Sequence, residues 1–439
     1  MERYNEYKDS GVYFIPDIPN SWQVLKAKYL FKQEKREVCP EDEIVTCFRD
    51  GQVTLRKNRR TEGFTNSMKE IGYQGVRKGD LVIHNMDAFA GAIGVSDSDG
   101  KGTPVYACCT PKRNDINQYY YCYLLRYLAR NGFILSLAKG IRERSTDFRF
   151  NDFKELYLPV PSKEEQDAIV SYIDLQSTKI DEAIAQQQKM IDLLNERKQI
   201  IINNAVTKGL NPDAPMKDSG VDWIGEIPEH WEVMPIKRLK SKEKNAFVDG
   251  PFGSNLKSEH FVENGDVYVI ESGLITTGKY VHRELKTITK SHFETIKRSE
   301  CKANDIIIAK IGARFGMAGE LPELGKPCVV SGNSLKLTLD QSVMQNGMFV
   351  NYMGLAKWKG GFVGLYQETA QPALSLGALN NMMLPVPPIE EQLYILEQTS
   401  QKLDILDVAI INASKQISLL QERKQIIIND VVTGKVKVS

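Results

Sequence analysis

The stretch LLNERKQIIINNAVTKG runs from Leu193 to Gly209, and LLQERKQIIINDVVTGK runs from Leu419 to Lys435. The two stretches agree at 12 of 17 positions, although they lie about half the chain apart. Apolar residues in both recur in steps of three and four, the spacing typical of a helix with one apolar face. A chain that contains the same helical segment twice is an internal repeat, so the extent of that repeat decides the fold.

The repeat extends upstream of both helical stretches. LPVPSKEEQ, which begins at Leu158, recurs as LPVPPIEEQ from Leu384, at the same offset as the helical stretches. KDSGVYFIPDIPNSWQV, which begins at Lys8, recurs as KDSGVDWIGEIPEHWEV from Lys217, at a smaller offset. The second copy is therefore longer than the first, and the additional residues lie between the matched ends.

Two bodies that resemble each other only faintly lie between the matched ends, at residues 31–157 and 240–383. GDLVI at Gly79 and NDIII at Asn304 have the pattern of equivalent strands, each followed by glycines. The near-identical end segments, which we call the frame, enclose two unlike bodies. This pattern indicates that the frame holds two recognition modules with different targets.

A long helix is predicted from Lys163 to Thr207, a segment that contains neither Gly nor Pro. Ser162 and Glu165 form an S-x-x-E capping box at its start, and Gly209 follows its end. A helix of about 45 residues is roughly 65 Å long. The apolar seam of this helix and of its repeat comprises Ile169, Ile173, Ile180, Ile184, Ile191, Leu194, Ile201 and Ala205, followed by Ile395, Leu406, Ile410, Ile417, Leu420, Ile427 and Val431.

The two seams are expected to bury each other, because a single exposed helix of this kind is unstable in water. If a pseudo-two-fold axis relates the two halves, the helices run antiparallel and the C-terminus lies near residues 8–31. Polar residues that interrupt the seams either fix the register of the pair or form a solvated edge, and both interpretations stay open. These residues are Gln176, Gln187, Lys198, Lys402 and Lys424.

Size and composition are those of an ordinary soluble protein of two or three domains. The chain has 439 residues, of which 42% are hydrophobic and 26% are charged, and its formal net charge is +1. A surface that binds nucleic acid must therefore be local. Because there is no apolar stretch of membrane-spanning length and no apolar signal core, we expect a cytoplasmic protein. The seven cysteines, an odd number without a C-x-x-C pair, are interpreted as reduced thiols.

Motifs for catalysis are missing from the sequence. The five histidines do not have H-E-x-x-H spacing, and there is no P-loop. GPFGS at Gly250 does not match the G-x-G-x-x-G of dinucleotide or methyl-donor sites, and the N-P-P-aromatic box of amino-methyltransferases is absent. We therefore expect a chain with no catalytic residue, no metal site and no cofactor of its own.

Signals for DNA binding are stronger in the first body. LRKNRRTEGFTNS, which begins at Leu55, brings four cations together, and clustered Arg and Lys neutralise phosphates while Arg and Asn can read base edges. Residues 32–157 contain 21 Lys and Arg against 17 Asp and Glu, whereas the helix is slightly acidic. The alternative interpretation is a solvated charged loop. The candidate DNA-binding residues of this body are Arg56, Lys57, Asn58, Arg59, Arg60, Arg142 and Arg144.

In the second body, polar residues are presented by glycine-containing turns. These turns are DGPFGSNLKS from Asp249, AKIGARFGMAG from Ala309, SGNSLKL from Ser331 and YQETAQPALS from Tyr366. Glycine allows a backbone to approach a partner closely, although ordinary hairpin turns have the same composition. The candidate DNA-binding residues here are Ser254, Asn255, Lys257, Lys310, Arg314, Asn333, Lys336, Gln367 and Gln371.

Over essentially its whole length, the chain resembles the specificity subunits of type I restriction-modification systems. The resemblance rests on GVDWIGEIPEHWEV, LPVPPIEEQ and LLNERKQIIINNAVTKG, in the order recognition domain, helix, recognition domain, helix. GDLVIHNMDAFAGAIGVSDSDG and DGPFGSNLK also resemble segments of that family's recognition domains. YFIPDIPNSW, in the first copy, is a looser version of the tryptophan segment.

The resemblance implies an α+β fold with two mixed α/β target-recognition domains joined by two long antiparallel coiled-coil helices. The first recognition domain would comprise residues 1–157 and the second residues 211–383, with spacer helices at 158–210 and 384–439. Each domain would read one half of a split double-stranded DNA site, and half-sites on one face of the duplex would lie roughly 10 bp apart.

Partners implied by the resemblance are two methyltransferase (modification) subunits and restriction (motor-nuclease) subunits. S-adenosylmethionine, ATP and Mg²⁺ are expected in those partners, and the modified base would be adenine. No membrane is implied. Two alternatives from other classes are a coiled-coil adaptor without a DNA role and a self-contained DNA-modifying enzyme.

Overall fold

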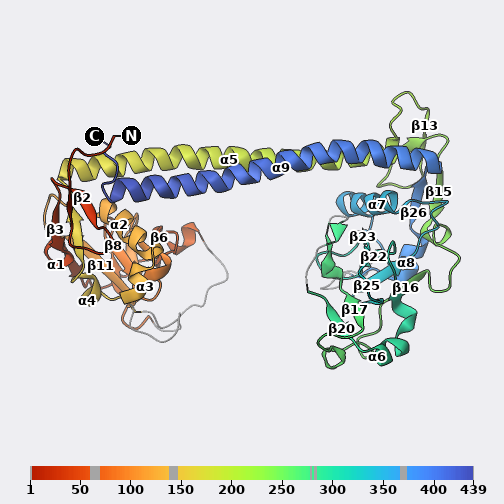
Figure 1. Cartoon of the computed structure of the whole chain (residues 1–439), viewed down its shortest axis with the longest axis horizontal. Helices are drawn as coiled ribbons and strands as arrows, with labels where there is room; N and C mark the ends of the chain where they lie inside the picture. Colours follow the sequence, from red (N-terminus) through yellow and green to blue (C-terminus); the bar gives the residue numbers. More distant parts are fainter. Residues whose placement is uncertain are drawn as a thin grey trace. The chain divides into compact units, whose positions relative to one another are not determined.

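The structure is a computed structural model that describes residues 2–59, 70–137, 147–276, 279–280, 284–365 and 373–438. The chain forms two compact units, each with its own α+β body and segments of two long helices (Figure 1). Unit 1 comprises Met1–Gln188 and Ser414–Ser439, and unit 2 comprises Lys189–Ala413. The boundaries between the units therefore fall within the helices.

The long helices are α5, Lys163–Lys208, and α9, Ile389–Val432. At the start of α5, the Ser162 hydroxyl accepts the Glu165 N–H at 3.2 Å, which is one of the two bonds of the predicted capping box. Gly209 follows α5 with φ of 70°, a left-handed conformation that ends a helix with little strain in glycine. None of the described helices is long and apolar enough to cross a membrane.

The two long helices pack together and run antiparallel. Two ion pairs join them: Asp181 with Lys424 at 2.7 Å, and Lys198 with Asp407. From the first pair to the second, the residue number increases along α5 and decreases along α9, as antiparallel helices require. The second pair is the repeat of the first, because each of its residues occupies the equivalent position in the other copy. Lys198 and Lys424, which interrupt the predicted seams, are thus paired across the helices, which favours a role in fixing register.

The opening segments form equivalent hairpins. In unit 1, β1 (Tyr7–Asp9) pairs with β2 (Asp17–Pro19), and in unit 2, β13 (Met216–Asp218) pairs with β14 (Glu226–Pro228). A second antiparallel pair closes each body: β3 (Gln23–Lys26) with β12 (Tyr157–Val160), and β15 (Glu232–Pro235) with β26 (Met383–Val386). The matched sequence ends therefore correspond to matched structure.

The C-terminal end of α9 packs on the first opening segment, as predicted. The Tyr7 hydroxyl donates to the Lys435 carbonyl at 3.1 Å, and Glu2 and Lys437 form a β-bridge. Trp22 is fully buried there, so close to Gly434 that an added Cβ would lie 2.8 Å from its ring. In unit 2, Trp231 is equally buried and lies beside the glycine that ends α5.

Each body contains a four-stranded antiparallel sheet of the same order. In unit 1 the order is β4 (Phe31–Glu34), β11 (Tyr106–Pro111), β8 (Leu81–His84) and β9 (Ile93–Val95); in unit 2 it is β16 (Phe247–Asp249), β25 (Ser334–Leu337), β22 (Ile306–Ala309) and β23 (Ala318–Glu320). The strands predicted as equivalent, β8 and β22, occupy the same place. Gly79 and Asn304 precede them, both with positive φ. Each body thus has its own sheet with the same strand order.

The bodies differ in what surrounds this sheet. Among its described residues, unit 1 adds two short antiparallel pairs and four α-helices: β5 (Val45–Cys47), β6 (Val53–Leu55), β7 (Gln74–Val76), β10 (Gly100–Gly102), α1 (Ala27–Leu30), α2 (Gln118–Arg130), α3 (Phe133–Leu137) and α4 (Phe150–Phe153). Unit 2 adds a mixed sheet, a short pair and three helices: β20 (Lys286–Ile288), β17 (Val267–Ile270), β24 (Cys328–Val330), β21 (Glu300–Cys301), β18 (Ile275–Thr276), β19 (Lys279–Tyr280), α6 (Lys290–Thr295), α7 (Asn346–Lys359) and α8 (Leu376–Asn381).

A buried glutamine at the start of each long helix holds the body onto the frame. Gln392 is fully buried; its side-chain carbonyl accepts the Gln345 N–H at 2.9 Å, and its NH₂ donates to the Val343 and Pro387 carbonyls at 2.8 Å each. These bonds link α9 to the turn before α7. The equivalent Gln166 makes the same three bonds at the start of α5, to Asn117 N–H, Asp115 O and Pro161 O. The repeated EEQ motif is thus explained by this glutamine.

Candidate nucleic-acid interface

The cationic loop of unit 1 comprises residues 56–60 and follows β6. Lys57 forms an ion pair with Glu43, and Arg59 forms one with Asp50 at 2.7 Å. Surface ion pairs of this kind contribute about 1 kcal/mol or less, so a DNA phosphate can replace the carboxylate at little cost. These ion pairs partly neutralise the cations of the loop, and its binding of phosphate stays a prediction.

Two other members of the cationic loop are held against β5 and β6. Arg56 donates from Nε to the Thr46 hydroxyl at 3.2 Å, and the Asn58 amide donates to the Thr54 hydroxyl at 2.9 Å. These bonds fix the start of the loop on the body. Arg60, Arg142 and Arg144 lie outside the described residues.

Arg49 is a further cation of unit 1 and was not among the predicted residues. Its exposed side chain reaches Asp87 at 2.8 Å, and Asp87 follows β8. His84, at the end of β8, packs on the Tyr106 ring, and burial lowers the pKa of its imidazole. A lone arginine between short elements gives no sequence signal; only the fold places it beside the loop after β8.

In unit 2 the structure brings together three of the turns that the sequence singled out. The loop cluster comprises residues 249–257, which follow β16, 310–314, which follow β22, and 331–333, which precede β25. Neighbouring strands run antiparallel, so these loops share one end of the sheet.

Direct contacts confirm that the loops of this cluster touch one another. A Cβ at Gly250 would lie 1.9 Å from the Ser331 carbonyl, and the Lys310 N–H donates to the Asn333 carbonyl at 2.9 Å. The close approach that Gly250 permits is therefore between two loops of this chain rather than toward a partner.

The cluster exposes several polar side chains and the aromatic ring of Phe252. Phe252, which was not among the predicted residues, is 69% exposed. Arg314 donates to the Gly273 carbonyl at 2.9 Å, which orients its guanidinium. Apolar rings beside polar groups are able to contact base edges or stack on bases. The exposed predicted residues of this cluster are Ser254, Asn255, Lys257, Arg314 and Asn333.

The structure does not favour Lys336 as a DNA contact. Its side chain is only 9% exposed within β25, where it lies 3.8 Å from Asp305 and donates to the Asn245 carbonyl and the Thr338 hydroxyl. Lys310 is half-buried and pairs with Asp249 at 3.1 Å, so it joins two loops. Both lysines stabilise the body. Gln367 and Gln371 lie outside the described residues.

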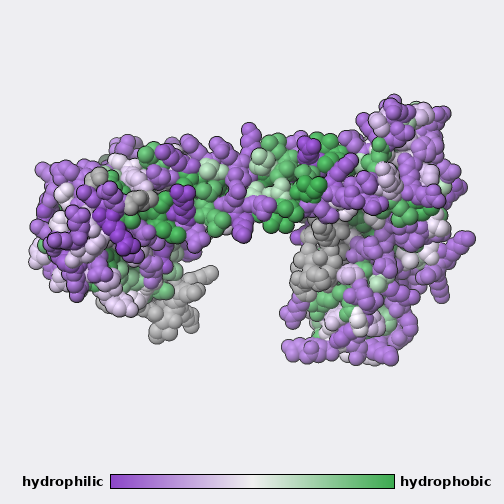
Figure 2. Space-filling view, turned by 45° about the horizontal axis from the view of Figure 1, so that its top comes forward, coloured by the Kyte–Doolittle hydropathy of each residue, from purple (hydrophilic) through white to green (hydrophobic). Residues whose placement is uncertain are grey.

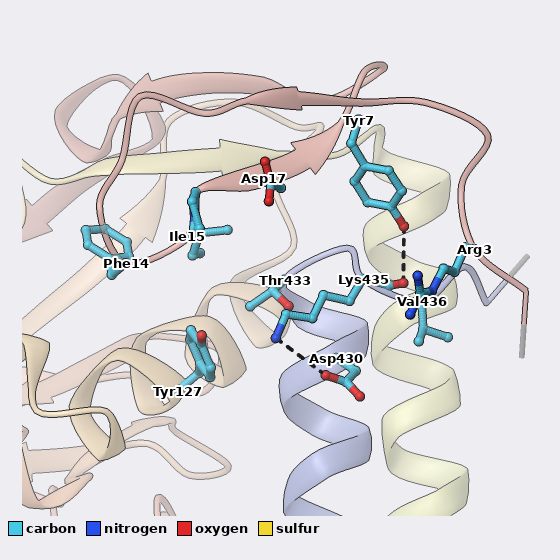
Figure 3. A pocket seen from close by; sticks show the side chains of 11 residues that line it. Arg3, Tyr7, Phe14, Ile15, Asp17, Tyr127, Asp430, Thr433, Lys435 and Val436 are labelled. Carbon is cyan, nitrogen blue, oxygen red and sulfur yellow. Dashed lines mark hydrogen bonds and ion pairs between the residues drawn. The ribbon is translucent and has the colours of Figure 1, made fainter.

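A pocket of about 670 Å³ lies in unit 1, where the chain ends meet (Figure 3). Tyr7 and Phe14 form part of its wall, and its charged groups include Asp430 and Lys435, which lie 3.8 Å apart. Apart from Tyr127, which comes from α2 of the body, this wall belongs to the frame, so we do not assign the pocket to DNA reading. Among the described residues there is no group of three or more metal-ligating side chains, and the cysteines are free thiols.

Comparisons with known proteins agree with the residue-level reading. Residues 228–419 match the family described as type I restriction modification DNA specificity domain. The type I restriction enzyme MjaVIII specificity subunit of Methanocaldococcus jannaschii is 25% identical over 74% of this chain and 72% of its own length. The type I restriction enzyme EcoBI specificity subunit of Escherichia coli is 24% identical over 61% of this chain and 56% of its own.

Solved structures share the fold. A chain from a study of complex assembly and conformational transition of the type I R-M system has a TM-score of 0.71 and 14% identity, covering 95% of this chain and 99% of that one. The HsdS subunit from Thermoanaerobacter tengcongensis has a TM-score of 0.52 and 13% identity, covering 95% and 98%. With its duplicated frame and two unlike bodies, the chain is similar over most of its length to type I restriction-modification specificity subunits, and its residues 228–419 match that family's DNA specificity domain.

Proposed function

We propose that this chain is the DNA-reading subunit of a type I complex, in which each body reads one half of a split site. The observation that carries the proposal is the combination of a duplicated frame with two bodies that differ around a common sheet. A shared frame supplies equivalent positions, and different loops supply different base contacts.

Exposed apolar residues on the long helices support the docking of two identical partners. Leu193 and Ile200 on α5 are 52% and 44% exposed, and their repeats Leu419 and Ile426 on α9 are 54% and 50% exposed. Hydrophobic side chains gather along these helices in the space-filling view (Figure 2). Exposed apolar surface at repeated positions is typical of an interaction site, and the repeat implies two copies of one partner.

The partners in this proposal are two modification subunits, which would supply S-adenosylmethionine and methylate adenine. Restriction subunits that use ATP and Mg²⁺ would join the same complex. This chain would supply recognition and spacing, and the chemistry would take place in the partners.

A methylation map would test the proposal directly. DNA from cells that express this chain with its modification subunit would be sequenced by a single-molecule method that detects N6-methyladenine. We expect a bipartite motif with one modified adenine in each half, absent without this chain. A stable complex that leaves DNA unmodified, and binds DNA with no dependence on salt, would favour the adaptor alternative instead. Binding of S-adenosylmethionine by the isolated chain would favour the self-contained enzyme.

The spacer role has its own test. Insertion of one helical turn of residues into both long helices would lengthen the frame and leave both bodies unchanged. The expected result is a longer gap between unaltered half-sites in the methylation map. Changed bases within a half-site would contradict the spacer role.

A further inference from the structure

Two histidines of unit 2 stack on each other beside the loop cluster. His260 ends a short 3-10 turn, Ser258–His260, and His292 lies in the first turn of α6. Their ring centroids are 4.0 Å apart, and the ring planes differ by 18°. The side chain of His260 is 26% exposed, so protons from the solvent can reach the pair.

Each ring bonds the backbone of the loop cluster. The Lys257 N–H donates to His260 Nδ1 at 2.9 Å, and His292 Nε2 donates to the Asn255 carbonyl at 2.9 Å. Between these two bonds, Leu256 packs against a hydrophobic cluster to which β17 and α6 contribute. Three consecutive residues of the loop are therefore held, and we call them the anchored segment.

The two bonds require a defined proton on each ring. A ring nitrogen that accepts an N–H carries no proton, so His260 is neutral and has its proton on Nε2. A ring nitrogen that bonds a carbonyl must donate, so His292 carries a proton on Nε2. A second proton on His292 leaves its bond in place, whereas a second proton on His260 removes the acceptor of the Lys257 N–H. Acid therefore breaks the contact of His260 alone.

Charged groups around the pair do not replace this contact. Glu259 lies 3.9 Å from His260 Nε2 and 3.9 Å from Lys257 Nζ, so its carboxylate is shared. On α6, Glu294 pairs with Lys297 at 3.1 Å. Glu259 thus lies nearest the ring nitrogen that already carries a proton, while the nitrogen that acid would protonate faces the Lys257 N–H.

The anchored segment carries groups that were predicted to bind DNA. Asn255 and Lys257 are both exposed, and the exposed Ser254 precedes them. The Asn255 N–H donates to the Phe252 carbonyl at 2.7 Å, so the turn that exposes the Phe252 ring ends on this segment. Displacement of the anchored segment would therefore move the exposed tip of the loop cluster.

We propose that His260 and His292 are positioning residues, which hold the anchored segment in the conformation that reads DNA and release it in acid. This inference rests on the proposed function. His260 is the acid-sensitive contact, since histidine side chains gain a proton between about pH 8 and about pH 5. Loss of one backbone hydrogen bond corresponds to a decrease of about fivefold in the affinity of the chain for its DNA site.

The substitution His260→Asn separates the hydrogen bond from the titration. The asparagine carbonyl oxygen can take the place of Nδ1 as acceptor, and it gains no proton in this range of pH. At about pH 7.5, His260→Asn should bind DNA like the unaltered chain, whereas His260→Ala should bind about fivefold more weakly. His292→Gln should likewise retain the donor to the Asn255 carbonyl and bind normally.

The binding assay uses the full chain with its modification subunit and DNA that carries the site found in the methylation map. Acid changes the charge of many groups, so the measured quantity is the affinity of the unaltered complex divided by that of the His260→Asn complex at the same pH. This ratio should be about 1 at about pH 7.5 and about one fifth at about pH 5.5. His230→Asn, which changes an exposed histidine that pairs with Glu391 on the frame, is the matched control and should leave the affinity unchanged at both pH values.

Nitrogen NMR of the full chain labelled at its histidines shows the protonation of each ring without DNA. At about pH 7.5, His260 should have an unprotonated Nδ1 and a protonated Nε2, and the spectrum of His260→Asn identifies its signals. The Lys257 N–H should exchange with solvent more rapidly in His260→Ala than in the unaltered chain.

Outcomes separate this inference from the proposed function. If the affinity ratio stays at about 1 at both pH values, or if His260→Ala binds DNA like the unaltered chain, the inference is overturned while DNA reading stands. A protonated Nδ1 on His260 at about pH 7.5 would also overturn it, because Lys257 could not donate there. Absence of specific DNA binding by the unaltered chain at both pH values would overturn the proposed function, and the positioning role would be lost with it.

Discussion

Replacing the buried Gln392 by Ala should destabilise unit 2 through the loss of its hydrogen bonds. The change removes three hydrogen bonds of 2.8 to 2.9 Å. It leaves one backbone N–H and two carbonyls without their partner in a buried place. Each lost bond contributes about 1 kcal/mol, so the expected loss is about 3 kcal/mol. For a unit of this size, that corresponds to a decrease in Tm of roughly 6–12 °C.

Chemical denaturation followed by tryptophan fluorescence measures this loss, since Trp231 is buried in unit 2 and Trp22 in unit 1. Gln401→Ala, an exposed glutamine on the same helix, provides the control and should change the free energy of unfolding by less than about 0.5 kcal/mol. If Gln392→Ala were as mild as this control, the three bonds would not hold the body on the frame. Retained stability with a body that still reads its half-site would refute the reasoning entirely.

Three further predictions concern side chains of the bodies. Lys336→Met should destabilise unit 2 by about 3 kcal/mol, because it leaves the buried Asp305 carboxylate without its cation, while the affinity of the folded protein for DNA stays unchanged in a binding titration. Cys301 and Cys328 lie directly opposite each other on β21 and β24, and a hydrogen bond from Cys301 lowers the pKa of the Cys328 thiol. Hydrogen peroxide should therefore oxidise the two thiols to a disulfide and be reduced to two water molecules. The loss of two hydrogens from the protein should appear as a mass decrease of about 2 Da. Alanine at all four cations of the cationic loop should weaken DNA binding and reduce its salt dependence, and unchanged affinity at physiological salt would remove that loop from the interface.

The frame could be predicted from the sequence because its physics is periodic and duplicated. The seam at Ile169, Ile173 and Ile180 is buried in unit 1, and the capping serine and terminal glycine lie where the pattern placed them. A second copy of each motif made the antiparallel pairing and the position of the C-terminus inferable from chain order alone. Repetition therefore substituted for knowledge of tertiary contacts.

Individual residues of the interface could not be predicted in the same way. Lys336 and Arg314 both stand in polar, glycine-containing stretches, yet one is buried against Asp305 and the other is exposed. A strand residue and a loop residue of the same charge look alike until the sheet order is known. Convergence of the unit 2 loops depends on β22 and β25 being neighbours in the sheet, although β23 and β24 come between them in the sequence.

The two copies of the frame also differ in a hydrogen bond, although the residues at the equivalent positions are the same. Trp231 donates from Nε1 to Glu391 at 3.1 Å, whereas the equivalent indole N–H of Trp22 has no partner among the described residues. The equivalent carboxylate, Glu165, instead accepts the hydroxyl of Tyr4. Burial and this carboxylate raise the pKa of Tyr4, so its phenol stays protonated and continues to donate.

Tyr4→Phe should therefore cost little stability. The substitution removes the donor that holds Glu165, and the carboxylate becomes available to the Trp22 indole, which lies close by because the Tyr4 and Trp22 rings are 6.1 Å apart. One hydrogen bond replaces another, so the free energy of unfolding should change by less than about 1 kcal/mol. The indole proton of Trp22 should shift downfield in the NMR spectrum and exchange more slowly with solvent. A loss of about 2 kcal/mol or more, with the indole resonance unmoved, would show that Tyr4 rather than Glu165 holds this end of the frame together.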